Sequence, residues 1–442
     1  MARIDPDFPE GGAVTVGAVG DIYIGKALRA QADPGFAAAV RALRACDVRF
    51  ANLEVQLLQR PTAAAAQAPG AWAGAPAALG DELAWLGINV VSTANNHAGD
   101  YGADGLRQTE ETLCRLGIRY AGTGADLAQA RRHTVIDTPG GRVAVLAVSS
   151  SHLDHARAGR RRPDAPGRPG VSPLRFGTRY RVDAQAYAAL ERIARNLPRD
   201  GHAKHRERPL ARNYDKERGE TLSLFGTQFV RGDAFGVESW AAPDDAADIE
   251  AAVRAARRDA EWVLLSLHTH EYDSRPEVPA AFAVELACRA VEAGADAVIA
   301  HGAHGVRGVQ VHQGRPIFHG IGAFVFQPYL FPTQPADFFE AYAMGDAELG
   351  EVYRARRESA GFYRHRSPWE ALLVRLSCRR GEPPAFTVRP LVLWSGAAEP
   401  DGLPRLAEGP EARRLMEKVA DLSRDLGTGL RLDREQYVLL GA

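Results

Sequence analysis

Residues 13–21 read AVTVGAVGD, a short apolar run that ends in a glycine and an aspartate. Runs of about four to eight apolar residues with many β-branched side chains are typical of buried strands. Similar runs recur at Asp47–Ala51, Ile88–Ser92, Val143–Val148, Trp262–Leu267 and Ala297–Ala300. Segments between them, such as Gly105–Leu116 and Val278–Ala293, have helical periodicity. This alternation predicts an α/β fold in which helices cover both faces of a largely parallel sheet.

The composition excludes several classes of protein. Hydrophobic residues make up 45% and charged residues 25% of the 442 residues, as in an ordinary globular protein. The formal net charge is −1, which gives the chain no overall electrostatic reason to bind nucleic acid. The 4 cysteines stand far apart, so neither a disulfide framework nor a cysteine zinc site is indicated. We find no secretory leader and no membrane-spanning run, and we therefore expect a cytoplasmic protein without a membrane anchor.

The domain organisation is less regular than the strand pattern. We expect one α/β domain over about residues 12–330 and a C-terminal extension, residues 331–442, that packs on the same domain. An insertion rich in arginine and proline, at about residues 151–235, interrupts the first part. Connections of this length are often lids or binding loops, and arginine suits carboxylate or phosphate. We expect the insertion to fold over the site and to contact substrate, and the alternative is a solvated surface elaboration.

Polar, metal-capable residues follow the predicted strands, with the exception of Val143–Val148. They are Asp21, Glu54, Asn96 with His97, His268 with His270, and His301 with His304. Ligands of open α/β sheets bind beyond the carboxyl ends of the strands, so these side chains are expected to converge. Alone, a Gly-Asp pair after a strand is usually a turn, and a lone buried histidine is usually a core residue. Together, carboxylate, amide and imidazole donors predict a site for zinc, manganese or iron.

Four stretches of sequence resemble the bacterial capsule-synthesis CapA family. They are Gly20-Asp21, Asn52-Leu53-Glu54, the segment from Ala94 to Gly102, which reads ANNHAGDYG, and the block from His301 to Phe326. The resemblance extends from about Ala13 to Gln327, apart from the insertion. That family is named for poly-γ-glutamate capsule production and is related to calcineurin-like metallophosphatases. The resemblance implies a four-layer αββα metallophosphatase-like sandwich with a metal centre between two sheets.

The resemblance also implies a set of metal ligands. Asp21 matches the first carboxylate ligand, Glu54 the carboxylate that bridges two metals, and Asn96 a ligand of the second metal. The imidazoles of His268, His301 and His304 complete the set. The cofactor implied is one or two divalent ions, either manganese, zinc or iron.

The sequence departs from the family pattern at several of these places. Tyr23 stands where metallophosphatases usually have a histidine two residues after the first aspartate. The usual His-His-Pro-His is His301-Gly302-Ala303-His304, and the usual Trp-Gly after the late histidine is Thr269-His270. These changes leave the number of metals open at one or two, with His270 or His301 as compensating ligands.

Three residues are candidates for catalysis. His97 follows a ligand-type asparagine and is expected to protonate a leaving group. Asp100, three residues on, would orient His97 through its second ring nitrogen, or would cap the following helix. Glu271 would be a partner of the neighbouring imidazoles or a proton acceptor, and its alternative is a solvated loop residue. We expect His270, Asn52 and Arg175 to contact substrate.

These residues predict a soluble metal-dependent hydrolase that cleaves an amide or peptide-like bond, including a γ-glutamyl bond. A phosphoesterase with the same metal centre is one alternative. A non-catalytic metal-binding component of capsule or poly-γ-glutamate biosynthesis is another. The expected partner is a small-molecule or peptide-like substrate of anionic character. No nucleic acid is expected, and a homo-oligomer is left open.

Overall fold

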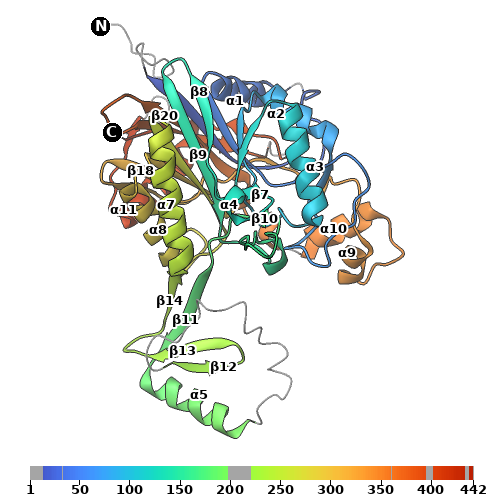
Figure 1. Ribbon diagram of the computed structural model, residues 1–442, viewed down its shortest axis with the longest axis vertical. Coiled ribbons are helices and arrows are strands. Elements are labelled where there is room, and N and C mark those ends of the chain that lie inside the picture. The colour runs from blue at the N-terminus through green and yellow to red at the C-terminus, as the bar shows by residue number, and fades with distance from the viewer. Residues whose placement is uncertain are drawn as a thin grey trace.

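The computed structural model describes residues 13–31, 33–197, 221–359, 361–394, 402–433 and 438–441. Their fold is mixed α/β, as predicted, and its body contains two large sheets (Figure 1). The larger sheet has ten strands: β1 Val14–Tyr23, β2 Val48–Leu53, β5 Val90–Ser92, β6 Arg119–Ala121, β19 Ala323–Phe326, β20 Glu370–Cys378, β21 Ala385–Val392, β22 Arg405–Leu406, β23 Arg431–Asp433 and β24 Val438–Gly441. The smaller sheet has six: β8 Thr134–Thr138, β9 Gly141–Ser149, β15 Trp262–Thr269, β16 Ala297–Gly302, β17 Val309–His312 and β18 Arg315–Phe318.

The remaining elements connect and cover these sheets. The helices are α1 Pro34–Arg44, α2 Gly80–Leu86, α3 Gly102–Arg115, α4 Leu127–Ala130, α5 Ala184–Asn196, α7 Pro243–Asp259, α8 Ala281–Glu292, α9 Ala336–Ala341, α10 Leu349–Ser359 and α11 Gly409–Asp425. Two short pairs of strands are β3 Gln56–Leu58 with β4 Gly74–Pro76, and β7 Thr123–Gly124 with β10 Gly170–Val171. Each predicted strand of the α/β pattern therefore forms, and each lies in one of the two large sheets.

The central strands run parallel, which places their carboxyl ends on one edge of the body. In the larger sheet β1 is parallel to β2 and β19, and in the smaller sheet β15 is parallel to β9 and β16. These strands are buried on both faces, which explains why they are continuous apolar runs rather than alternating ones. On β1, Val16 contacts the core between the sheets, whereas Val19 belongs to the core on the outer face.

The core between the sheets joins them face to face. It contains Val16 and Phe50 from the larger sheet and Val145, Leu264 and Ile299 from the smaller one. Each fully buried side chain of this size stabilises the fold by about 1.5–3 kcal/mol. A second core lies under α1, α2 and α3, and a third lies under α7 and α8. Helices thus cover the outer face of each sheet.

Helix α1 illustrates how local sequence and packing agree. Asp33 caps its N-terminus by accepting a hydrogen bond from the backbone N–H of Phe36 at 2.7 Å, and Pro34 occupies the first turn. Phe36, Val40 and Leu43 recur at helical spacing and are buried against the sheet. Loss of the cap would remove one of the few partners of the first helical amides.

The C-terminal residues complete the body. Strand β20 pairs antiparallel with β1 on the side opposite β2, and β21 pairs with β20. Helix α11 places Leu415 and Val419 in the core between the sheets. The described residues within 331–442 thus share the larger sheet and the core between the sheets with the rest of the body. The division into a domain and an extension stays a prediction.

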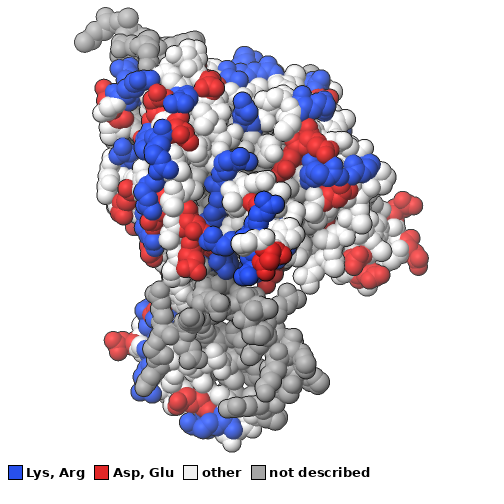
Figure 2. All heavy atoms as spheres, in the orientation of Figure 1, with Lys and Arg blue, Asp and Glu red and all other residues white. Residues whose placement is uncertain are grey.

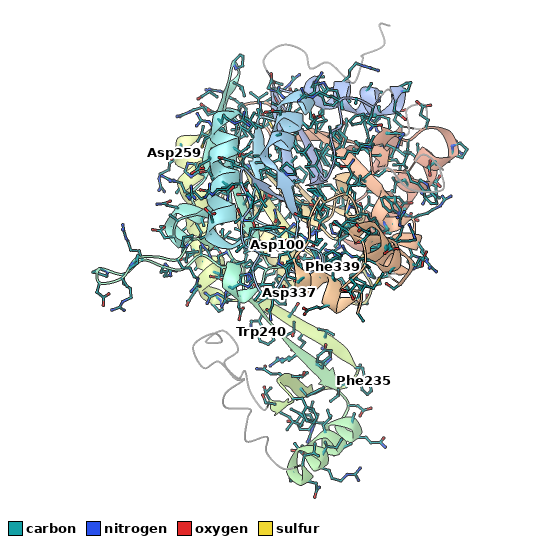
Figure 3. The ribbon with its side chains drawn as sticks, turned by 90° about the vertical axis from the view of Figure 1, so that its right-hand side faces the viewer. Asp100, Phe235, Trp240, Asp259, Asp337 and Phe339 are labelled. Atoms are coloured by element: carbon teal, nitrogen blue, oxygen red, sulfur yellow. The ribbon has the colours of Figure 1, made fainter. Side chains whose placement is uncertain are left out.

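Residues of the expected insertion divide into two parts. Residues near 156–174 lie on the body, where β10 pairs with β7. Strands β11 Phe176–Val182 and β14 Gly236–Ala241 form a ribbon that projects from the body and carries β12 Leu222–Leu224, β13 Thr227–Arg231 and α5 (Figure 1). Figure 3 shows Trp240 near the root of this arm and Phe235 farther out. The charged run 202–218 lies outside the described residues, so the expected contact with substrate stays a prediction.

Charges of both signs are interspersed over the described part of the face drawn in Figure 2. This matches the balance of 54 Lys and Arg against 55 Asp and Glu. Within the described part of the chain, every helix is too short or too polar to cross a membrane.

Candidate metal centre

Asp21 lies inside β1 and not after it, at a point where the strand pairing is irregular. The register of β1 against β2 shifts between Ala18 and Asp21, and its register against β19 shifts directly after Asp21. A β-bulge of this kind re-aims a side chain. Gly20 permits the close approach that follows, because a Cβ there would lie 1.8 Å from the carbonyl oxygen of Gly322. The Asp21 side chain is fully buried between the two sheets.

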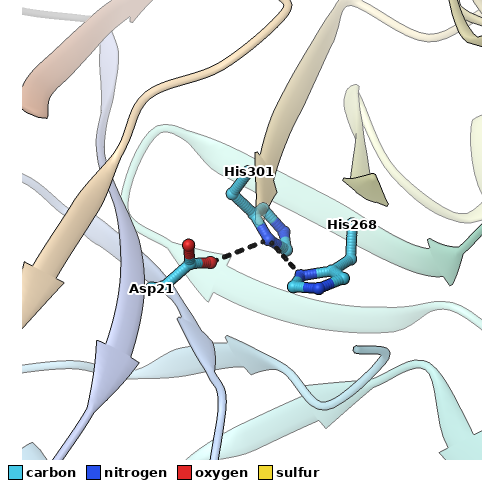
Figure 4. A group of neighbouring side chains, drawn as sticks. All are labelled: Asp21, His268 and His301. Carbon is cyan, nitrogen blue, oxygen red and sulfur yellow. Dashed lines mark hydrogen bonds and ion pairs between the residues drawn. The ribbon is translucent and has the colours of Figure 1, made fainter. Parts of the chain in front are cut away.

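His268 and His301 meet Asp21 from the smaller sheet. They are direct neighbours in the register of β15 and β16. His301 Nδ1 lies 3.2 Å from Asp21 Oδ1 and 3.1 Å from His268 Nδ1 (Figure 4). All three side chains are buried, and one ligand atom of each lies within 4.8 Å of the others. This first group therefore could hold a metal ion.

Glu54, His270 and His304 form a second group with the same mutual spacing of at most 4.8 Å. Glu54 follows β2, His270 follows β15, and His304 follows β16. His268 connects the groups, because its Nε2 lies 3.1 Å from His270 Nε2 and 3.7 Å from Glu54 Oε1. His304 has φ 51°, a left-handed conformation that is rare for a residue with a side chain and that concentrates at functional sites.

Burial favours the neutral form of the His268 and His270 imidazoles. Burial, with the neighbouring His270 and His301, holds the pKa of His268 well below its ordinary value. Burial likewise lowers the pKa of His270 to about 3. Burial alone would raise the pKa of Asp21. Hydrogen bonds with His301 and His304 outweigh this effect and hold the pKa of Asp21 well below its usual range. Asp21 thus presents an ionised carboxylate, and His268 and His270 present neutral ring nitrogens, which are the forms that bind metals.

One carboxylate and one amide near the two groups have side-chain oxygens without a hydrogen-bond partner among the described residues. Both carboxylate oxygens of Glu54 and the side-chain oxygen Oδ1 of Asn96 are buried and accept no hydrogen bond. Buried polar groups are normally paired, and a buried carboxylate without a partner is costly. A divalent cation bound at about 2.0–2.2 Å would satisfy them. The residues present therefore fit a divalent ion, as the sequence predicts.

Supporting hydrogen bonds orient the ligands. Asn52 donates to Asp21 Oδ1 at 2.8 Å, and Asn95 donates to Asn52 Oδ1 at 3.2 Å. Ser266 Oγ lies 2.7 Å from His301 Nε2, which leaves Nδ1 directed at Asp21. Ser266 and Asn95 were absent from the sequence-based prediction. Ser266 stands two residues before His268 on an otherwise apolar strand, so strand alternation places both on one face and could have identified it.

His97 and Asp100 form a buried pair next to the centre. His97 Nδ1 lies 2.7 Å from Asp100 Oδ2, and that oxygen also accepts the backbone N–H of Ala73 at 2.7 Å. The first residue of α3 is Gly102 and its N-cap is Tyr101, which makes no side-chain capping bond. Asp100 is therefore hydrogen-bonded to His97, and the structure gives it no capping bond to α3. The edge of the Tyr23 ring packs on His97 at 5.2 Å between centroids.

Two other predicted residues have partners within the protein. Glu271 accepts hydrogen bonds from the hydroxyls of Ser150, Ser151 and Thr269, at 2.6, 3.0 and 2.9 Å to its Oε2. Arg175 binds both oxygens of Asp245, at 2.7 and 2.9 Å. These contacts account for both side chains without substrate. The expected roles of Glu271 in proton transfer and of Arg175, Asn52 and His270 in substrate binding stay predictions.

Gly302 leaves space for the His268 ring of the neighbouring strand, and its replacement is a test of the centre. Its φ is 98°, its N–H donates to Asp21 Oδ2 at 3.1 Å, and a Cβ there would lie 2.7 Å from His268 Cε1. We expect Gly302→Ala to lower the free energy of unfolding by about 1–3 kcal/mol and to weaken metal binding. Gly345→Ala is the control, because Gly345 is exposed with nothing near its Cβ position. Equal thermal unfolding of the two variants would contradict this role for Gly302.

The family described as "Bacterial capsule synthesis protein PGA_cap" matches residues 15–328. This range contains Asp21, Glu54 and Asn96 and the histidines of the two groups, His268, His270, His301 and His304. The matched range ends before α9, so α9, α10, β20–β24 and α11 lie outside it.

Individual relatives extend the comparison. The protein y4uA of Sinorhizobium fredii is 32% identical over 433 residues, which cover 95% of this chain and 91% of the relative. Its protein y4sH is 31% identical over the same shares of both chains. A "Probable polyglutamine synthesis accessory protein" of Mycobacterium tuberculosis is 26% identical over 246 residues, 55% of this chain and 46% of that protein.

Proposed function

Because this chain belongs to the bacterial capsule synthesis family PGA_cap, and because its centre fits a divalent ion, we propose that it is a metal-dependent hydrolase of an amide or peptide-like bond. A γ-glutamyl bond is the preferred substrate linkage. The family description and the polyglutamine-related name of the mycobacterial relative support a γ-linked or similar amide substrate. We also propose that the body is an αββα metallophosphatase-like sandwich, which is supported by two facing sheets with helices outside each.

One observation carries the proposal: Glu54 is a fully buried carboxylate whose two oxygens have no hydrogen-bond partner. A purely structural glutamate at such a place would cost stability, because its burial is not offset by a donor. Glu82, which is also buried, accepts hydrogen bonds from two backbone N–H groups and forms an ion pair with Arg29. The contrast supports the proposal that Glu54 binds a cation.

The protein's own residues would divide the work as follows. Asp21, His268 and His301 would hold one ion, and Glu54, His270 and His304, with Asn96, would hold a second. A bound divalent ion supplies Lewis acidity towards a substrate oxygen and towards water. Ser266 and Asn52 keep the ligands in position through the hydrogen bonds described above.

His97 would move the proton. Its Nδ1 is engaged by Asp100, which sets the tautomer and leaves Nε2 to exchange a proton with a leaving group. The pair is nearly buried, so bulk water has limited access to it. Asp100 is here a positioning residue, since it acts through His97.

The test is a comparison of two substrate classes with metal-loaded and chelator-treated protein. We expect the loaded protein to cleave γ-glutamyl peptides, and we expect activity to disappear on chelation and to return when the ion is restored. Cleavage of aryl phosphates in place of the peptides would favour the phosphoesterase alternative. Full metal occupancy without any product from either class would instead assign the protein to non-catalytic metal binding.

A further inference from the structure

Arg356, on α10, is partly buried and, unlike the buried Arg131 and Arg307, has no carboxylate or carbonyl acceptor among the described residues. Its guanidinium carbon lies 5.9 Å from the ring centroid of Tyr363 and 6.0 Å from those of Tyr329 and Phe338. One donor, Nη1, is buried and has no hydrogen-bond partner, and Nη2 makes only a long contact of 3.4 Å to the Tyr363 hydroxyl. Among the described residues no carboxylate forms an ion pair with Arg356.

Arg131 and Arg307, which are buried in the described part of the chain, each leave one guanidinium nitrogen unpartnered but also have acceptors. Arg131 pairs with Asp245 at 2.9 Å. Arg307 donates to the carbonyl oxygens of Pro276 and His270, at 2.9 and 3.2 Å. Arginine stays charged at any ordinary pH, so Arg356 carries a charge that the aromatic rings only partly offset. A planar fork of donors without an acceptor suits a ligand that brings its own negative charge.

A layer of aromatic rings connects Arg356 with the metal centre. The Tyr363 ring stacks on Phe326 at 6.0 Å between centroids, and Phe326 lies 4.8 Å from the His304 ring. Phe326 also contacts Tyr23 at 5.9 Å, and Tyr23 contacts His97. Figure 1 shows α10 beside the lower end of α3, at the edge of the body from which β11 and β14 project. The Tyr363 and Phe326 rings thus lie between Arg356 and His304.

We propose that Arg356 binds an anionic group of the substrate, a carboxylate or a phosphate, beside the metal centre. The binding of an anion follows from the unpaired guanidinium, and only its description as part of a substrate rests on the proposed function. The residue lies outside the range matched by the family, so this anion site belongs to the C-terminal part of the chain. A γ-linked glutamyl substrate fits, because it carries a free α-carboxylate next to each amide.

The test measures binding and not turnover, so that its failure is distinct from a failure of the hydrolase proposal. Metal-loaded wild-type protein, Arg356→Met and Arg354→Met are titrated by calorimetry with γ-glutamylglutamate, with its fully amidated form and with inorganic phosphate. Arg354 is the matched control, because it lies on the same helix and is exposed. All proteins are compared at equal metal content, since anions also bind metal ions.

We expect Arg356→Met to weaken binding of one anionic probe by about 10- to 100-fold, the loss of a charge-assisted hydrogen bond, and Arg354→Met to leave it unchanged. Weakening confined to the dipeptide assigns a carboxylate, and weakening confined to phosphate assigns a phosphoryl group. The amidated form should bind wild type and Arg356→Met alike. Equal affinities of the two proteins for every anion would overturn the proposal. If Arg356→Met does not fold, Arg356→Gln, which removes the charge but keeps the polar side chain, replaces it in the same comparison.

Discussion

Replacing Glu54 with glutamine is expected to remove most of the bound metal and all measurable hydrolysis. Glu54 reaches both ligand groups, through His268 on one side and through His270 and His304 on the other. Loss of a residue that only orients a ligand costs about 10- to 100-fold in metal affinity, and loss of a shared ligand should cost more. Metal analysis after dialysis measures the effect, and metal retained at the wild-type level would refute the role of Glu54 as a shared ligand.

Glu82→Gln is the matched control for that experiment. Glu82 is also buried, but its oxygens accept from the backbone of Leu28 and Arg29. We expect this control to be destabilised and to keep its metal. The opposite is expected for Glu54→Gln in the absence of metal, because it removes an unpaired buried charge and should raise the free energy of unfolding by at least about 1 kcal/mol.

The pH dependence of this stabilisation has a definite sign. Burial, followed by the charges of Asp21 and Asp100, raises the pKa of Glu54 well above its ordinary value. A carboxyl with a raised pKa in the folded state lowers stability progressively as the pH rises from its unfolded-state pKa to its folded-state pKa. The advantage of Glu54→Gln over metal-free wild type should therefore be smallest near pH 4 and grow above it, with about 4.3 as the unfolded-state pKa. Chemical denaturation at several pH values measures it.

His97→Asn is expected to keep the metal and the fold while kcat falls by about 100-fold or more, the contribution of a general acid. Asparagine retains a polar group at the position of Nδ1 but cannot exchange a proton. The kinetics of metal-loaded protein on the substrate class identified above measure this effect. Undiminished kcat at full metal occupancy would exclude proton transfer by His97.

His133→Asn is the matched control for this variant. His133 also contacts a carboxylate, that of Asp259, at 3.0 Å, but both residues lie away from the two ligand groups. We expect its kcat to equal that of wild type. A comparable loss in the control would show that the defect of His97→Asn is general and not chemical.

The positions of the central parallel strands β1, β2, β5, β9, β15 and β16 could be predicted from the sequence, because each is a local property. A strand buried on both faces must be apolar over its whole length, and this requirement is visible in residues 13–21 without any partner strand. The convergence of carboxylate and imidazole side chains could be predicted for a similar reason, since the carboxyl ends of parallel strands meet at one edge. Membership of the capsule synthesis family is confirmed by the match over residues 15–328.

The details of the centre depend on contacts between residues far apart in the chain. The shift in pairing that places Asp21 inside β1 involves β2 and β19, which lie tens to hundreds of residues away. Ser266 pairs with His301, and Asp100 pairs with His97. These contacts depend on strand register and side-chain rotamers, which cannot be read from the periodicity of the sequence. The alternative capping role of Asp100 looked equally good in sequence, because an aspartate shortly before a helix satisfies the local rule.

Arg356 is the clearest case of what only the tertiary structure decides. In sequence it is one of several basic residues on an amphipathic helix, and such residues are usually solvated. Packing of α10 against Phe338, Tyr329 and Tyr363 buries its guanidinium, and no carboxylate of the described chain accompanies it. Local sequence thus determined the central strands and the types of polar side chain near their ends, because burial and strand ends constrain residue type directly. Tertiary structure decided which of these side chains lie close together and that Arg356 has no carboxylate partner among the described residues. Both depend on distances between segments that are far apart in the sequence.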